Sequence, residues 1–201
     1  MKLYEFKTTR AYKCRWLINE LGIDCEFNEV NLMEGEHRQE DFLKINPCGK
    51  VPALVDGDFN LFEASAICIY LADKHPEKGL IPKPATPSRA IFDKWLFFMS
   101  NELECHLWAM EKNTWGYPED KRSADAIEMA GKDFIDALSI IDAEMTDKEY
   151  LVDNKFSVAD ISLGYLLRWA KGRKLIQDFP KLCQYLDTLT ERDHYPREIF
   201  Q

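Results

Sequence analysis

The chain has 201 residues, of which 46% are hydrophobic, so it can bury the core of one or two globular domains. Its formal net charge of −9 argues against nucleic acid or an acidic membrane as a partner, since both attract basic surfaces. It has no apolar run long enough to span a bilayer, its N-terminus lacks the pattern of a signal peptide, and its six cysteines are scattered without metal-ligand spacing. These features predict a metal-free protein of the reducing cytoplasm.

The first 75 residues alternate between strand and helix patterns. Gly22 is expected to close the first helix, because glycine accepts the left-handed conformation that ends many helices. Asp56-Gly57 is a strong hairpin signal, since such turns need positive φ. The expected order is strand, helix, strand, irregular segment, strand, strand, helix, with strands at 2–6, 25–30, 53–55 and 60–62 and a last helix from Ser65 to about His75.

Pro52 lies at the start of the third expected strand, which suits a residue that cannot donate a ladder hydrogen bond. If the bond from Val51 to Pro52 is cis, Val51 faces outward and its backbone can pair with a ligand as an added strand does. Ala64 and Ser65 begin the next helix, whose unpaired N–H groups attract carboxylates. This block predicts a site for a small peptide. Taken alone, a hairpin capped onto a helix explains it equally well.

The second part of the chain begins after a proline-rich stretch at 78–88, which indicates a linker. Everything beyond it has helical spacing. Ser88 is expected to cap a long helix, a second helix is expected at about 123–146, and Phe179-Pro180 is expected to start the last. Ser157 and Asp160, three residues apart, form a capping pair before an apolar helix.

Four stretches of this sequence resemble motifs of the soluble glutathione S-transferase family, of a bacterial-like type with Ser or Thr in the first loop; they lie at 8–22, 42–54, 61–71 and 156–161. The resemblance covers essentially the whole chain, and its cis-proline and capping motifs are specific when they occur together. It implies an α/β, thioredoxin-like N-terminal domain with a mixed four-stranded sheet, followed by an all-α C-terminal domain. The expected boundaries are 1–77 for the first domain, 78–88 for the linker and 89–201 for the second domain.

The implied reaction is attack by the glutathione thiolate on an electrophile or a disulfide, with glutathione as co-substrate. In the family, a Tyr or Ser just after the first strand donates to the thiolate, or else a Cys acts directly; here Thr8 and Thr9 occupy that place. Counting back from Lys13 favours Thr8, whereas a one-residue difference in loop length favours Thr9. Tyr12 is a rival donor. Alternatively, both threonines only end a strand and cap the first helix.

The resemblance also assigns residues that bind glutathione. Val51 pairs its backbone with the cysteinyl unit in a geometry held by Pro52, and Glu63 meets the γ-glutamyl ammonium. The next position normally carries a hydroxyl for the γ-glutamyl carboxylate, but this chain has Ala64 there. Losing one hydrogen bond to a charged group costs about 1.5–3 kcal/mol, unless Ser65 or a dimer partner compensates.

Lys50 and His37 are candidates for the glycyl carboxylate, with solvated surface positions as the alternative for each. The electrophile pocket is expected between the domains, where Trp108 and Trp115 share one face of a long helix. Such an aromatic stripe otherwise belongs to a core. Arg168 is a further candidate, although its stem can pack while its charged head stays in water.

Two classes of function remain open at this point. The first is an enzyme: a glutathione transferase acting on small hydrophobic electrophiles, or alternatively a glutathione-dependent disulfide or peroxide reductase on the same site. The second is a non-catalytic binding or regulatory protein on the same fold. Thr8, Val51, Pro52 and Glu63 favour the enzyme, whereas Ala64 favours the non-catalytic protein. The resemblance further implies a homodimer, without a nucleic acid or membrane partner.

Overall fold

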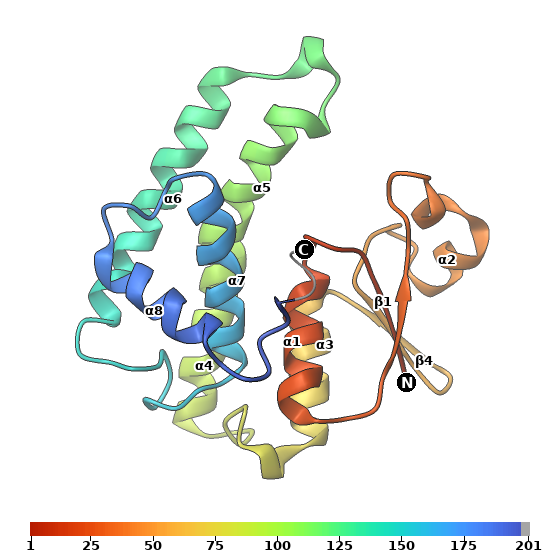
Figure 1. The fold of residues 1–201 in the computed structure, drawn as a ribbon, viewed down its shortest axis with the longest axis horizontal. Helices are drawn as coiled ribbons and strands as arrows, with labels where there is room; N and C mark the ends of the chain where they lie inside the picture. The colour runs from red at the N-terminus through yellow and green to blue at the C-terminus, as the bar shows by residue number, and fades with distance from the viewer. Residues whose placement is uncertain (198–201) are drawn as a thin grey trace. The chain divides into compact units, whose positions relative to one another are not determined.

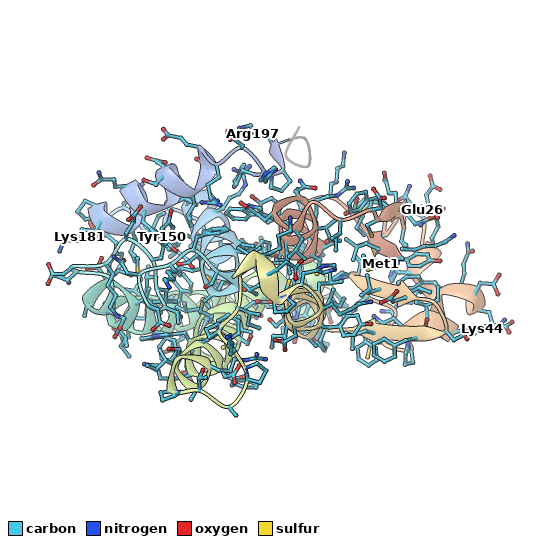
Figure 2. The ribbon with its side chains drawn as sticks, turned by 90° about the horizontal axis from the view of Figure 1, so that it is seen from below. Met1, Glu26, Lys44, Tyr150, Lys181 and Arg197 are labelled. Atoms are coloured by element: carbon cyan, nitrogen blue, oxygen red, sulfur yellow. The ribbon has the colours of Figure 1, made fainter. Side chains whose placement is uncertain are left out.

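A computed structural model describes residues 1–197, which divide into two compact units. The first contains residues 1–81 and 191–197; the second contains residues 82–190. Figure 2 labels Met1, Glu26 and Lys44 in the first unit, and Tyr150 and Lys181 in the second. The division falls within the expected linker, but the end of the expected C-terminal domain belongs to the first unit. Within residues 1–197 no helix is both long and apolar enough to cross a membrane.

The first unit is built on a mixed four-stranded sheet in the order β2-β1-β3-β4. β1 runs parallel to β2 and antiparallel to β3, and β3 forms a hairpin with β4. This arrangement confirms the predicted α/β architecture. The elements are β1 (Lys2–Glu5), α1 (Ala11–Leu21), β2 (Glu26–Glu29), η1 (Glu36–Arg38), α2 (Glu40–Ile45), β3 (Ala53–Asp56), β4 (Phe59–Phe62), α3 (Ala64–Lys74) and η2 (Pro76–Lys78).

The core of the first unit lies between the sheet and two helices. α1 packs against α3, and the two lie side by side in Figure 1. Leu3 of β1 is opposite Leu54 of β3, and both are fully buried, as are Leu17 of α1 and Ile67 of α3. Gly22 ends α1 in the left-handed conformation, as predicted. Removal of this apolar surface from water is the main force that holds the sheet to the helices.

The segment predicted to be irregular contains a helix, α2, that the sequence pattern missed. α2 has only six residues, too few to be stable alone. Its Phe42 is buried in a small cluster with Val30, Val51 and Ala53. Packing of Phe42, rather than intrinsic propensity, therefore stabilises this short helix. A segment of six residues is too short for helical periodicity to be recognised in the sequence.

The second unit is helical throughout its described length, as predicted. Its first helix begins two residues earlier than expected, because Thr86, not Ser88, caps it: the Thr86 hydroxyl accepts the N–H of Arg89, and Pro87 takes the first helical position that suits proline. The elements are α4 (Pro87–Phe98), a π-helical η3 (Met99–Glu104), α5 (Cys105–Glu111), a π-helical η4 (Lys112–Gly116), η5 (Glu119–Lys121), α6 (Ala124–Glu144), α7 (Val158–Gly172) and α8 (Pro180–Thr190).

The predicted capping pair closes the buried start of α7. The Ser157 hydroxyl accepts the N–H of Ala159, and the Asp160 carboxylate accepts the N–H and the hydroxyl of Ser157. Asp160 is fully buried and also accepts the N–H of Leu151 at 2.8 Å and the hydroxyl of Tyr185 at 2.7 Å. Burial raises the pKa of the Asp160 carboxyl, and these hydrogen bonds oppose that shift.

Candidate functional site

Three segments of the first unit meet at one end of its sheet. β1 and β3 are antiparallel with Tyr4 opposite Ala53, so the loop after β1 begins where the chain leads into β3. Ala53 is also opposite Phe62, so Glu63 leaves β4 at that same end. The register thus brings together the β1–α1 loop, the segment before β3 and the start of α3, which contain most of the predicted binding residues.

The segment before β3 leaves its backbone open. The Val51–Pro52 peptide bond is cis. The Val51 side chain is buried against Phe42 and Ala53, whereas its N–H and C=O form no hydrogen bond with any described residue. Unpaired backbone groups beside a strand can pair with an extended peptide. The side chain of Val51 thus lies inward rather than outward as expected, while its backbone groups stay unpaired among the described residues, and their pairing with a ligand backbone stays a prediction.

Asn46 holds this segment in place, and the sequence reasoning gave it no role. Its side chain is buried, its Nδ2 donates to the carbonyl of Lys50 at 2.6 Å, and its Oδ1 accepts the N–H of Cys48 at 3.0 Å. The available signal was the residue type, because Asn side chains commonly bond to nearby backbone in turns. Asn46 fixes the turn that delivers Val51 to the end of the sheet.

The two threonines of the β1–α1 loop differ in how their hydroxyls are used. The Thr9 hydroxyl donates to the carbonyl of Phe6 at 2.6 Å and accepts the N–H of Ala11 at 3.4 Å. The Thr8 side chain is exposed, and its hydroxyl bonds to no described residue. Thr8 also has φ of 59°, a left-handed conformation that is rare for a β-branched residue. Strained residues of this kind concentrate at functional sites.

The start of α3 is an uncapped helix end. Glu63 occupies the N-cap position without a side-chain cap, and its φ of 73° is also outside the usual range for a residue with a side chain. Ala64 is buried and carries no hydroxyl, whereas Ser65 is half-buried. The first N–H groups of the helix therefore have no cap from Glu63. Such an end attracts a carboxylate.

His37 and Lys50 lie next to the turn before β3. Gly49 approaches the backbone so closely that a Cβ there would lie 2.8 Å from the carbonyl oxygen of His37. The Nδ1 atom of His37 is buried without a hydrogen-bond partner among the described residues. Burial lowers the pKa of His37, and the nearby charge of Arg38 lowers it further, which favours a neutral ring. Lys50 is exposed.

The three residues predicted for an electrophile pocket all lie in the second unit. The rings of Trp108 and Trp115 meet edge to face at 6.1 Å between centroids. Trp115 is 60% exposed, so this pair is not part of a sealed core. Arg168 is half-buried on α7. The structure brings the two tryptophans together, and their role in binding a substrate stays a prediction.

Comparison with known proteins decides the family. Residues 1–73 match the family described as "Glutathione S-transferase, N-terminal domain", and residues 90–193 match "Glutathione S-transferase, C-terminal domain". The chain belongs to the glutathione S-transferase family. Glutathione S-transferase 3 of Zea mays is 35% identical to this transferase over 169 residues, covering 83% of this chain and 76% of the relative. Glutathione S-transferase Z2 of Arabidopsis thaliana is 31% identical over 198 residues, covering 95% and 86%.

Solved structures agree with this assignment. The bacterial glutathione S-transferase BphK, in a ternary complex, superposes with a TM-score of 0.88 at 25% identity, covering 100% of this chain and 98% of that one. A sphingomonad glutathione S-transferase complexed with glutathione gives a TM-score of 0.85 at 28% identity with the same coverage. The predicted family, fold and enzyme class are thus confirmed. These findings favour a glutathione transferase over a non-catalytic protein on the same fold.

Proposed function

We propose that this transferase binds glutathione at the end of the sheet defined by the β1–α1 loop, the segment before β3 and the start of α3. Val51 pairs its backbone with the cysteinyl unit, and Pro52 sets the course of that segment. Glu63 holds the γ-glutamyl ammonium, while the N–H groups of Ala64 and Ser65 hold the γ-glutamyl carboxylate. The unpaired backbone of Val51 and the uncapped start of α3 support this placement.

His37 and Lys50 bind the glycyl carboxylate of glutathione in this proposal. The buried, unpartnered Nδ1 of His37 supports a role in binding, because a buried polar atom without a partner is costly. Lys50 contributes a positive charge in water, which attracts a carboxylate over a longer range but binds it less tightly. Of the two, His37 is expected to matter more.

Thr8 is the proposed donor to the glutathione sulfur. The thiolate is the nucleophile, and an ordinary thiol has a pKa of about 8.5. Lowering that pKa by about two units requires roughly 2.7 kcal/mol of stabilisation of the anion, within reach of a hydroxyl hydrogen bond assisted by a helix N-terminus. The observation that carries the choice is the Thr9 hydroxyl, whose proton already bonds to the Phe6 carbonyl, while the Thr8 hydroxyl is free of described partners.

The proposed reaction is conjugation of the thiolate to a small hydrophobic electrophile. With a chlorinated nitroaromatic as the probe, the new carbon–sulfur bond forms as chloride leaves. The exposed Trp115 and its neighbour Trp108, with Arg168, are the proposed contacts for the electrophile. Reduction of a disulfide is the competing activity, and the first loop offers no cysteine for a mixed-disulfide step.

Turnover of the chlorinated nitroaromatic and of a small hydroxyalkyl disulfide tests the proposal in three proteins: wild type, Thr8→Val and Thr8→Ser. Replacing the hydroxyl in Thr8→Val should lower kcat about 100-fold, whereas Thr8→Ser keeps the donor and most of the activity. A wild type that is not retained on glutathione resin and turns over neither probe contradicts the proposed function. Full activity in Thr8→Val contradicts the assignment of Thr8 as the donor but leaves the proposed function standing.

The transferase is also proposed to act as a cytoplasmic homodimer. Apolar side chains are exposed on both units: Phe59 and Phe62 on β4, and Ile91 and Phe97 on α4. Pairing the first unit of one subunit with the second unit of another would remove this surface from water. The six cysteines are free thiols, as a reducing compartment favours. Sedimentation of the purified chain at micromolar concentration tests the dimer, and a monomer mass contradicts it.

A further inference from the structure

One face of α1 is covered by residues 192–195. Tyr195 lies 5.7 Å from the ring of Tyr12 and 5.0 Å from the ring of Trp16, edge to face with both. Tyr12 and Trp16 themselves meet at 5.9 Å, and all three rings are buried. In Figure 1 the last described residues run beside α1. This segment, residues 192–195, is called the clasp below.

Polar bonds fix the clasp to the same helix. Arg192 forms a bidentate ion pair with Glu20, at 2.7 and 2.9 Å, and the Glu20 side chain is only 5% exposed. Glu20 also accepts the indole N–H of Trp16 at 3.0 Å. The Nδ2 atom of Asn19 donates to the carbonyl of His194 at 3.3 Å. The Arg192 guanidinium donates two parallel hydrogen bonds to the two oxygens of the buried Glu20 carboxylate. This two-point contact gives the clasp a defined orientation.

The clasp connects to the β1–α1 loop through Tyr12. The Tyr12 N–H donates to the carbonyl of Thr9 at 3.1 Å, so the ring that the clasp holds belongs to the first turn after the loop. On the other side, the Thr9 hydroxyl ties the loop to the Phe6 carbonyl. Thr8 adopts its left-handed conformation inside the turn that the bond from Thr9 to Phe6 closes, next to the residue where the two bonds meet. A strained backbone of this kind persists only where the surroundings fix it from several sides.

We propose that Tyr195 and Arg192 are positioning residues for the reaction: they hold Tyr12, and through it keep Thr8 in the conformation that points its hydroxyl at the glutathione sulfur. This inference rests on the proposed role of Thr8. The clasp acts on activation of the thiol and leaves binding of glutathione to Val51, Glu63 and the start of α3. The clasp therefore serves the chemistry of the first loop.

The test compares full-length Tyr195→Ala, Tyr195→Phe and wild type. Tyr195→Phe keeps the ring and should behave as wild type. In Tyr195→Ala the pKa of the bound glutathione thiol, followed by thiolate absorbance against pH, should rise by about one unit, and kcat at neutral pH should fall about threefold, as the thiolate fraction does. KM for glutathione should stay within about twofold, a split that general destabilisation does not produce.

Two further proteins keep the test decisive. Arg192→Gln removes the ion pair but keeps the ring, and it should shift the thiol pKa in the same direction by less, even if Tyr195→Ala fails to fold. Tyr150→Ala is the matched control, since Tyr150 also meets a ring edge to face, that of Phe156 at 5.7 Å, in the second unit. Its thiol pKa should equal that of wild type.

Hydrogen exchange separates the clasp from the proposed function. The amides of Tyr12 and Lys13, which bond to the carbonyls of Thr9 and Arg10, should exchange at least about tenfold faster in Tyr195→Ala without any glutathione present. An unchanged exchange rate, or an unchanged thiol pKa in folded Tyr195→Ala, overturns the positioning role. A wild type without turnover whose amides still respond to Tyr195→Ala contradicts the proposed function, and with it the catalytic role of the clasp, but not the contact itself.

Discussion

The N-termini of α7 and α3 differ in how their free N–H groups are satisfied. At α7, Ser157 and Asp160 satisfy the terminal N–H groups from within the chain, and Asp160 is fully buried. At α3, Glu63 provides no side-chain cap and Ala64 has no hydroxyl. The first end is closed, and its residues only stabilise the fold. The second end is left open at the end of the sheet, which is what a ligand carboxylate requires.

The comparison extends to the backbone. Ser157 at α7 has the extended conformation that suits an N-cap, with φ of −152°, whereas Glu63 at α3 has φ of 73°. The closed end is relaxed and the open end is strained. A helix end that is both strained and uncapped costs stability, so its persistence in a stable fold points to function.

Removing the cap at α7 should give the largest effect. Asp160→Ala leaves the buried N–H groups of Leu151 and Ser157 and the Tyr185 hydroxyl without their acceptor, so the free energy of unfolding should fall by about 3–4 kcal/mol. Urea denaturation followed by circular dichroism measures it. Asp147→Ala, at an exposed aspartate, is the control and should change little. Equal loss in both variants would contradict the buried cap as the cause.

Closing the open end should strengthen binding. Ala64→Ser restores a hydroxyl where the ligand carboxylate is proposed to lie, and it should lower the dissociation constant for glutathione by about tenfold or more, from about 1.5 kcal/mol of added hydrogen bonding. Calorimetric titration measures the change. Ala66→Ser, two residues further along α3, is the matched control with no expected gain. If both variants bind like wild type, position 64 does not meet the carboxylate.

A smaller change at α7 separates the cap hydroxyl from the carboxylate. Ser157→Ala removes only the bond from the Ala159 N–H and the hydroxyl bond to Asp160, so it should destabilise the chain by about 1 kcal/mol. Thermal unfolding checks this value. Ser139→Ala on α6, where the hydroxyl bonds only to the carbonyl of Ile135, should be close to neutral. A loss as large as that of Asp160→Ala would show that the two groups act as one unit.

The strain at Glu63 should give the smallest effect on stability and the opposite sign. Glu63→Gly relieves the positive φ and should raise the unfolding free energy by up to about 1 kcal/mol after the entropy cost of glycine. The same variant should lose retention on glutathione resin. Glu63→Gln keeps the strain and removes only the charge, so it should weaken binding without a gain in stability. Destabilisation by Glu63→Gly would contradict strain at this position.

Much of the fold followed from local patterns. The Asp56-Gly57 hairpin, the left-handed Gly22 and the capping pair of Ser157 and Asp160 were predicted because each depends on the chemistry of a few adjacent residues. α2 was missed because its stability comes from the packing of Phe42. The cap of α4 was placed at Ser88 instead of Thr86, since several residues in that loop can cap a helix and spacing alone did not choose.

The candidate site divides in the same way. Residue types and order made Val51, Pro52, Glu63 and the two threonines candidates, because a proline at a strand start and a bare helix end follow from local chemistry. The roles of Asn46 and of the clasp were not predicted. Asn46 acts through contacts with Cys48 and Lys50 in a folded turn, and Tyr195 reaches Tyr12 from the other end of the chain.

The sequence by itself therefore determined the family, the order of most elements and the segments of the candidate site, since these rest on spacing and residue type. Only the tertiary structure decided which threonine has a free hydroxyl, because that depends on whether the Phe6 carbonyl lies within reach of Thr9. It also decided that residues 191–197 belong with the first unit, since contacts between distant segments leave no periodic trace in the sequence.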